Sequence, residues 1–100
     1  MPSHNLLEQA AIAQDPAFMD VVKMSLSGKI TEVLQDAASS EQDKRTATNA
    51  SSLLTRILSD VSEWCASANL STSSTDTEID DHIDVLFPTS IAYRVGSLNP

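Results

Sequence analysis

Apolar residues recur every three or four positions in four stretches of the chain, and this spacing predicts four helices. The first stretch covers residues 3–14, is rich in alanine, and has Ser3 in position to cap its start. The second begins at Asp15-Pro16, because aspartate caps helices and proline is tolerated at the first helical position. Its apolar stripe consists of Phe18, Val22, Leu26, Ile30, Val33, Leu34 and Ala37.

The strongest pattern in the chain predicts one long helix over residues 47–68. Residues 38–43, with serine caps followed by acidic side chains, separate this helix from the second one. A single helix of this length would be roughly 33 Å long, whereas the radius of gyration of so small a domain is about 13 Å. We therefore expect part of its apolar face to contact other chains. The apolar positions alternate steps of three and four, at Ala47, Ala50, Leu54, Ile57, Val61, Trp64 and Ala68.

The fourth helix opens with a capping box, Thr75-Asp76-Thr77-Glu78, and we expect Pro88 to end or kink it at Phe87. The residues that follow show only a loose alternation of apolar side chains, and so short a tail is hard to bury locally. The sequence thus predicts an all-α protein: a small four-helix bundle with one long central helix, in a domain over residues 1–88, and an extended C-terminal arm over residues 89–100.

Composition and charge exclude several classes of function. The chain has 100 residues, 14 of them acidic and 6 basic, and its net charge of −8 disfavours sequence-specific binding to nucleic acid. It has two glycines and four aromatic residues, which argues against a small β-barrel or sandwich. Its single cysteine excludes an internal disulfide and a thiolate metal cage. No apolar run is long enough to span a membrane and the N-terminus does not resemble a signal peptide, so we expect a soluble intracellular protein.

The acidic run of the fourth helix has two interpretations. A calcium-binding EF-hand loop needs a glycine at its sixth position and a glutamate at its twelfth, and the run has neither. Helix capping and a solvated charged surface explain it more simply, and such a surface could also meet a basic partner. We therefore expect no metal and no cofactor. The run consists of Asp76, Glu78, Asp80, Asp81 and Asp84.

Catalytic chemistry finds little support in the chain. Cys65 could act as a nucleophile with His82 as its base, but it lies on the apolar face of the predicted long helix, which indicates a buried structural thiol. The sequence contains neither a Gly-x-Ser-x-Gly motif nor a glycine-rich phosphate loop. We therefore expect a protein that is not an enzyme.

The order of these signals resembles that of the small all-helical virion proteins of tailed bacteriophages, of the head–tail connector type. Pro88 departs from the pattern, since such proteins tend to carry their last helix through this point. An alanine-rich first helix that leads into Asp15-Pro16-Ala17-Phe18 is similar as well. The other motifs that carry the resemblance are Leu53-Leu54-Thr55-Arg56-Ile57-Leu58 with Asp60, Trp64-Cys65-Ala66-Ser67-Ala68-Asn69, Thr75-Asp76-Thr77-Glu78-Ile79, Val85-Leu86-Phe87 and Ile91-Ala92.

The resemblance implies a neck adaptor located at the head–tail junction of the virion, and in the host cytoplasm during assembly. In such adaptors a ring of about twelve copies forms by one interface repeated until it closes, and a C-terminal arm docks on the portal protein, another neck protein or a neighbouring copy. The candidate contacts of the arm are Ile91, Tyr93, Arg94, Val95 and Leu98, and those of a second, charged surface are Asp80, Asp81 and Asp84.

Two other functions remain open. One is a capsid decoration or head-completion protein, which would be spread over the shell at high copy number. The other is a small regulatory protein that presents its acidic helix to a basic enzyme or DNA-binding protein. A thiol hydrolase that uses Cys65 is a more distant alternative.

Overall fold

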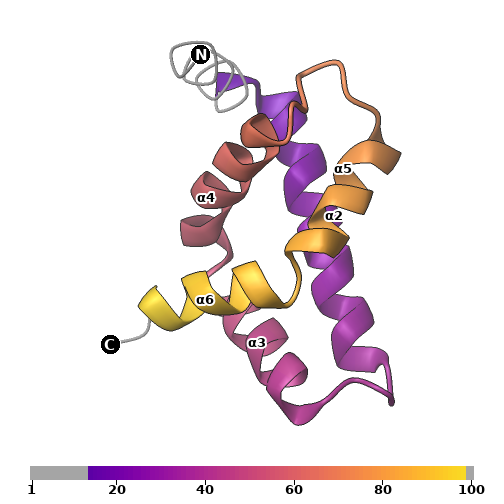
Figure 1. Cartoon of the computed structure of the whole chain (residues 1–100), viewed down its shortest axis with the longest axis vertical. Coiled ribbons are helices and arrows are strands. Elements are labelled where there is room, and N and C mark those ends of the chain that lie inside the picture. Colours follow the sequence, from indigo (N-terminus) through magenta and orange to yellow (C-terminus); the bar gives the residue numbers. More distant parts are fainter. Residues whose placement is uncertain (1–13, 99–100) are drawn as a thin grey trace.

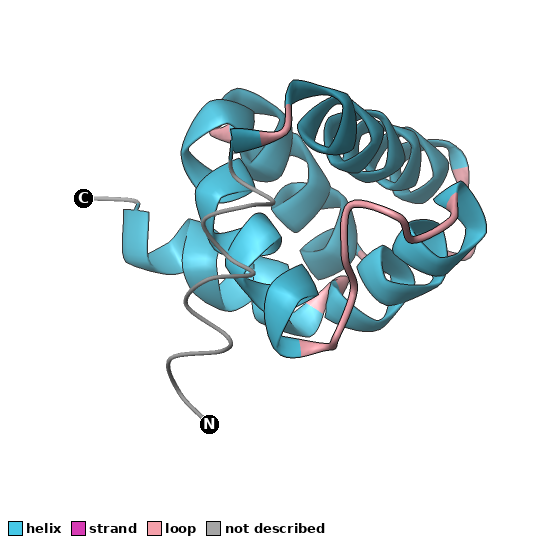
Figure 2. Ribbon diagram, turned by 90° about the horizontal axis from the view of Figure 1, so that it is seen from above, coloured by secondary structure: helices cyan, strands magenta, loops and turns pink. Residues whose placement is uncertain are grey.

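The computed structural model describes residues 14–98, and within this range the chain forms five helices and no strand (Figure 1, Figure 2). The expected all-α class is confirmed. The helix expected over residues 3–14 lies, apart from its last residue, outside the described range. The helices, labelled as in Figure 1, are α2 (Pro16–Gln35), α3 (Glu41–Ser52), α4 (Leu54–Ser67), α5 (Asp76–Leu86) and α6 (Thr89–Leu98).

Helix α2 begins where the Asp15-Pro16 pair predicts. One carboxylate oxygen of Asp15 accepts hydrogen bonds from the backbone N–H groups of Ala17, at 3.0 Å, and Phe18, at 3.2 Å. These bonds satisfy donors that have no partner inside the helix. Helix α2 packs against α3, α4 and α5, and the side chains that it buries between them are Phe18, Val22, Leu26 and Ile30.

The single long helix expected over residues 47–68 is wrong, because the chain bends at Leu53 and forms α3 and α4 instead. The hydroxyls of Thr48 and Ser52 donate to carbonyl oxygens one turn back, at 3.0 and 3.4 Å, and such bonds favour a bend. A straight helix would carry one of its halves away from α2. The bend keeps both α3 and α4 against α2, and the Cα radius of gyration is 13.4 Å.

The C-terminal segment corrects a second expectation. Residues 89–98 are not an extended arm but form helix α6, which lies across the bundle against α3, α4 and α5 (Figure 1). Helix α5 ends at Leu86, and Pro88 separates it from α6, as Pro88 predicts. Ile91 and Val95 are buried. Steps of four and three from Ile91 through Val95 to Leu98 place these side chains on one face of a helix, whereas a strand would need alternation.

The core continues through the turn that connects α4 to α5. Asn69 has a φ of 66°, in the left-handed region. The N–H groups of Asn69 and Leu70 donate to the carbonyls of Ala66 and Cys65, both at 3.0 Å, which is the hydrogen-bond pattern of a Schellman motif. The turn directs Leu70, which is 8% exposed, into the core. The part of the turn from Ser71 onward then brings the chain to the start of α5, beside α2.

Candidate interaction surface

At the start of α5, the acidic side chain of Glu78 has a structural role. The Thr75 N–H donates to the Glu78 carboxylate at 2.9 Å, and the Glu78 N–H donates to the Thr75 hydroxyl at 3.1 Å. This is the capping box that the sequence predicts. Hydrogen bonding of the Glu78 carboxylate to Thr75, first to its backbone N–H and then to its side chain, lowers the pKa of Glu78 below its ordinary value of 4.5. Glu78 is thus explained by the local fold.

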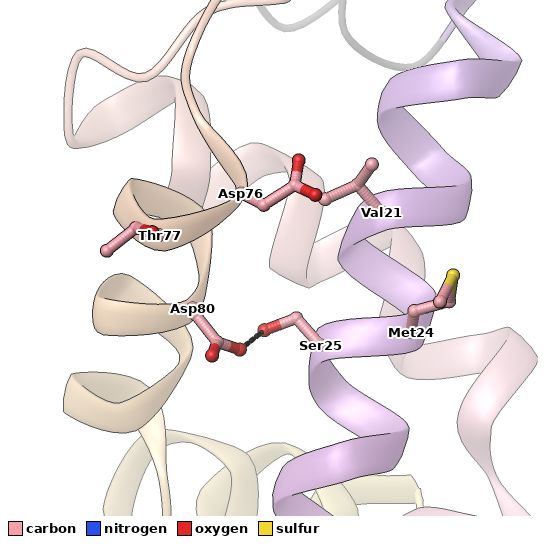
Figure 3. Close-up of a pocket in the computed structure, with 6 residues that line it drawn as sticks. All are labelled: Val21, Met24, Ser25, Asp76, Thr77 and Asp80. Atoms are coloured by element: carbon pink, nitrogen blue, oxygen red, sulfur yellow. Dashed lines mark hydrogen bonds between the residues drawn. The ribbon is translucent and has the colours of Figure 1, made fainter.

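Two further carboxylates of α5 contact α2. The hydroxyl of Ser25 donates to the carboxylate of Asp80, which extends from α5 toward α2 (Figure 3). One turn further along, the Lys29 Nζ lies 3.2 Å from a carboxylate oxygen of Asp84 and 3.6 Å from one of Glu32. Burial acts to lower the pKa of Lys29, but the hydrogen bonds and charges of Asp84 and Glu32 outweigh it and raise this pKa. Lys29 therefore stays charged and neutralises part of the negative charge between α2 and α5.

The remaining carboxylates of α5 face solvent. Asp76 and Asp81 are exposed, and neither forms a side-chain hydrogen bond or an ion pair within residues 14–98. Asp76 and Asp80 line a shallow hollow of about 290 Å³ between α5 and α2 (Figure 3). Met24, on the α2 side of this hollow, is 74% exposed. We call the surface formed by Met24, Asp76, Asp80, Asp81 and Asp84 the acidic face.

The carboxylates of the acidic face lie apart from one another on an open surface. In the part of the chain that the structure describes, no group of three histidine, cysteine, aspartate or glutamate side chains is placed to hold a metal ion. The hollow is open to solvent and lies on the surface. An open surface with separate carboxylates suits electrostatic contact with another molecule, since charge complementarity acts without an enclosed pocket.

Cys65 is fully buried in the core, as its position on the apolar face predicts. Burial raises the pKa of its thiol from 9.0 to about 11, so the thiol is protonated near neutral pH. The Nε2 atom of His82 is buried and has no hydrogen-bond partner among the described residues. It is therefore not placed to accept a proton from the Cys65 thiol.

The candidate contacts of the C-terminal segment do not form one surface. Ile91 and Val95 belong to the core, and Leu98 is half-buried against it. Arg94 forms an ion pair with Asp60 of α4. Of the five candidates, Tyr93 is the one that is mostly exposed, at 81%.

Sequence reasoning placed Asp80, Asp81 and Asp84 on an exposed helix but missed what lies beside them. Ser25 and Lys29 reach α5 only because α2 and α5 pack side by side, and no local pattern predicts this packing. Met24 lies outside the apolar stripe of its helix, but single apolar residues are common on protein surfaces, so the sequence alone does not mark it as a contact.

Comparisons with known proteins assign this chain to no family, so the protein is classified here by its all-α fold. No protein-family model matches the chain, and no curated protein and no solved structure is similar to it. Among the helices within residues 14–98, none has the length and the apolar character needed to cross a membrane.

Proposed function

We propose that this chain is a binding protein with no enzymatic role, which docks through its acidic face onto a basic surface of a partner protein. The observation that carries the proposal is the charge of α5, which has five carboxylates and neither lysine nor arginine over its eleven residues. Lys29 compensates Asp84, while Asp76 and Asp81 remain free of ion pairs within the described residues.

The exposure of these groups decides what they can contribute. Surface carboxylates gain little stability for their own chain, but they steer a positively charged partner and fix its orientation. Apolar side chains add the contact area that charge alone lacks, and Met24 and Val85, which are 74% and 77% exposed, are available on α2 and α5. Binding of this kind weakens as salt is added, because exposed charges are screened over about 8 Å at physiological ionic strength.

A charge-matched pair of double variants tests the proposal. Asp76→Asn with Asp81→Asn removes two charges from the acidic face, and Glu41→Gln with Glu63→Gln removes two charges from α3 and α4. Each tagged variant is used to capture partners from a cell extract at low and high salt, and the partners are identified by mass spectrometry. We expect a basic protein that binds the wild type and the control pair, is lost with the first pair, and is released by salt. Equal capture by both pairs would contradict the proposal.

A virion role is the second candidate, and one specific observation favours it. Tyr93 is 81% exposed on α6, and exposed tyrosines are common in protein interfaces. We propose that, in a head–tail connector, Tyr93 and the acidic face make the contacts with the portal or with neighbouring copies, because Ile91 and Val95 are covered by their own chain. Electron microscopy of virions with the labelled protein tests this. Label at one vertex supports a neck adaptor, and label over the whole shell supports the capsid decoration alternative.

A further inference from the structure

The junction between α3 and α4 is a helix break at a sequence without a strong helix breaker. Residues 51–55 read Ser-Ser-Leu-Leu-Thr and contain neither glycine nor proline. Leu53, the N-cap of α4, provides no side-chain hydrogen bond, and its φ of −107° and ψ of 16° are the only non-helical values between the two helices. Within the described chain, the N–H groups of Leu54 and Thr55 make no backbone hydrogen bond across the junction.

A small change at Leu53 would join the two helices. If Leu53 became helical, the N–H groups of Leu54 and Thr55 could donate to the carbonyls of Ala50 and Ser51, as in any α-helix. The alternate steps of three and four between apolar residues also continue across the junction without a shift. The apolar pattern thus supports a continuous helix, and the bend is held by the hydroxyl bonds of Thr48 and Ser52 and by the packing of both halves on the rest of the bundle.

Straightening would divide the fold into two parts, residues 14–52 and residues 54–98. The contacts of α2 with α4 and α5, and those of α3 with α6, all connect one part to the other. Opening a single copy would therefore uncover the core between the parts, to which α2 contributes Leu26 and α5 contributes Ile83, both fully buried. A second opened copy presents the same two faces and can restore every one of these contacts.

We propose that Leu53 is a hinge through which two copies of this chain exchange residues 54–98 and form a swapped dimer with a continuous α3–α4 helix. The occupant of the opened face is a second copy, because the same chain restores the contacts of α2 with α4 and α5 and those of α3 with α6. α3 and α4 make few contacts with each other, so straightening sacrifices little. The exchange adds backbone hydrogen bonds at both hinges and changes nothing elsewhere in the fold.

A proline at position 55 distinguishes the two forms. Thr55 lies in the first turn of α4, where its N–H has no backbone partner, so Thr55→Pro is compatible with the bent chain. In the continuous helix the same proline would remove a hydrogen bond and clash with the Ser51 carbonyl. The variants are refolded at high protein concentration and measured by size-exclusion chromatography with light scattering. We expect dimer from the wild type and Thr55→Ala, and at least a tenfold lower dimer fraction from Thr55→Pro.

A second pair of variants decides the matter even if Thr55→Pro fails to fold. Leu53→Ala and Leu53→Gly remove the same side chain, but alanine favours helical φ and ψ over the values of the bent chain more strongly than glycine does. With two hinges in each dimer, we expect the dimerisation constant of the alanine variant to exceed that of the glycine variant by several-fold. Equal constants would overturn the proposal.

Crosslinking shows whether the dimer is swapped. Ser25 and Asp80 are joined by a hydrogen bond between α2 and α5, which lie in different parts. In a variant with Ser25→Cys and Asp80→Cys, a short bismaleimide should link the two positions within one chain in the monomer fraction, and between two chains in the dimer fraction. A dimer whose crosslinks all lie within one chain, or a wild type that remains monomeric at every concentration, would refute the exchange.

Discussion

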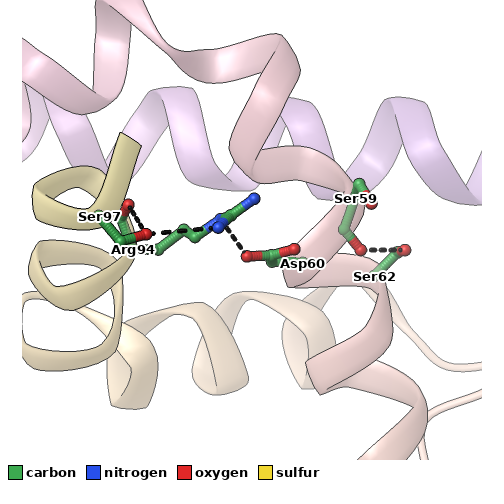
Figure 4. Close-up of polar contacts among 5 residues, drawn as sticks. All are labelled: Ser59, Asp60, Ser62, Arg94 and Ser97. Atoms are coloured by element: carbon green, nitrogen blue, oxygen red, sulfur yellow. Dashed lines mark hydrogen bonds and ion pairs between the residues drawn. The ribbon is translucent and has the colours of Figure 1, made fainter. Parts of the chain in front are cut away.

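Arg94 of α6 forms an ion pair with Asp60 of α4, so the last described helix is joined to the bundle by charge as well as by apolar packing (Figure 4). The Arg94 and Asp60 side chains are only 34% and 25% exposed. Arg94 also donates to the hydroxyl of Ser97 at 3.3 Å, within α6. On α4, the hydroxyl of the buried Ser62 donates to the carbonyl of Ser59 at 2.9 Å, so this buried polar group has a hydrogen-bond partner.

A double-mutant cycle measures this ion pair. Arg94→Gln and Asp60→Asn should each lower the free energy of unfolding, and the double variant should lose less than the sum of the two. We expect a coupling of about 1 kcal/mol, because both side chains are partly open to solvent, which screens the pair. Urea unfolding followed by circular dichroism provides the values. Strictly additive losses would show that Arg94 does not hold α6 on α4.

A matched pair of variants on α6 tests whether this helix belongs to the core. Ile91 is fully buried and Tyr93 is 81% exposed. Ile91→Ala should therefore lower the free energy of unfolding by about 2–5 kcal/mol, since it leaves a cavity. Tyr93→Ala should change it by no more than about 0.5 kcal/mol. If both variants were as stable as the wild type, α6 would not be packed on the bundle in solution.

The capping box of α5 makes stability depend on pH in the acid range. The pKa of Glu78 is lower in the folded chain than its ordinary value of 4.5, so the unfolded chain binds the proton more readily. The contribution of Glu78 is thus complete above that ordinary value and is lost as the pH falls through the lower, folded pKa. Glu78→Gln should flatten this part of the stability profile, as measured by urea unfolding between pH 2 and pH 7.

Thr75→Ala tests the other half of the capping box. It removes the hydroxyl that accepts the N–H of Glu78 and should cost about 1 kcal/mol at neutral pH. A Glu78→Gln profile identical to that of the wild type would show that the carboxylate does not bond to Thr75 in solution.

Local signals predicted the parts of this fold that depend on neighbouring residues. Asp15, Ser40 and Thr75 each cap the helix that follows them, and Pro88 separates the last two helices. A capping side chain bonds to backbone groups two or three residues away, so its effect can be recognised from the sequence. The apolar stripe of α2 was recognisable for the same reason, because its period is that of one helix.

The errors arose where distant segments decide the conformation. At Leu53 the apolar pattern favours a continuous helix, and the packing of α3 and α4 on α2, with the hydroxyl bonds of Thr48 and Ser52, bends it. Residues 89–98 have apolar positions too few to indicate a core, yet the bundle provides a surface for Ile91 and Val95. The same limit applies to the acidic face. Its carboxylates were predicted from α5, whereas Ser25 and Lys29 come from a helix more than fifty residues earlier in the chain.

The buried thiol of Cys65 provides a prediction in the alkaline range. Because burial raises its pKa from 9.0 to about 11, the folded chain holds the proton more tightly than the unfolded chain. Its contribution to stability is therefore complete below pH 9 and is lost as the pH rises toward 11.

At pH 8 the raised pKa alone should slow thiol modification by about 100-fold relative to the unfolded chain. Modification is followed with a chromogenic disulfide reagent, with and without urea. Cys65→Ala, which lacks the thiol, is the control, and its stability should fall less steeply between pH 9 and pH 11. Fast modification of the native protein would show that Cys65 is accessible, which would also reopen the question of a reactive thiol.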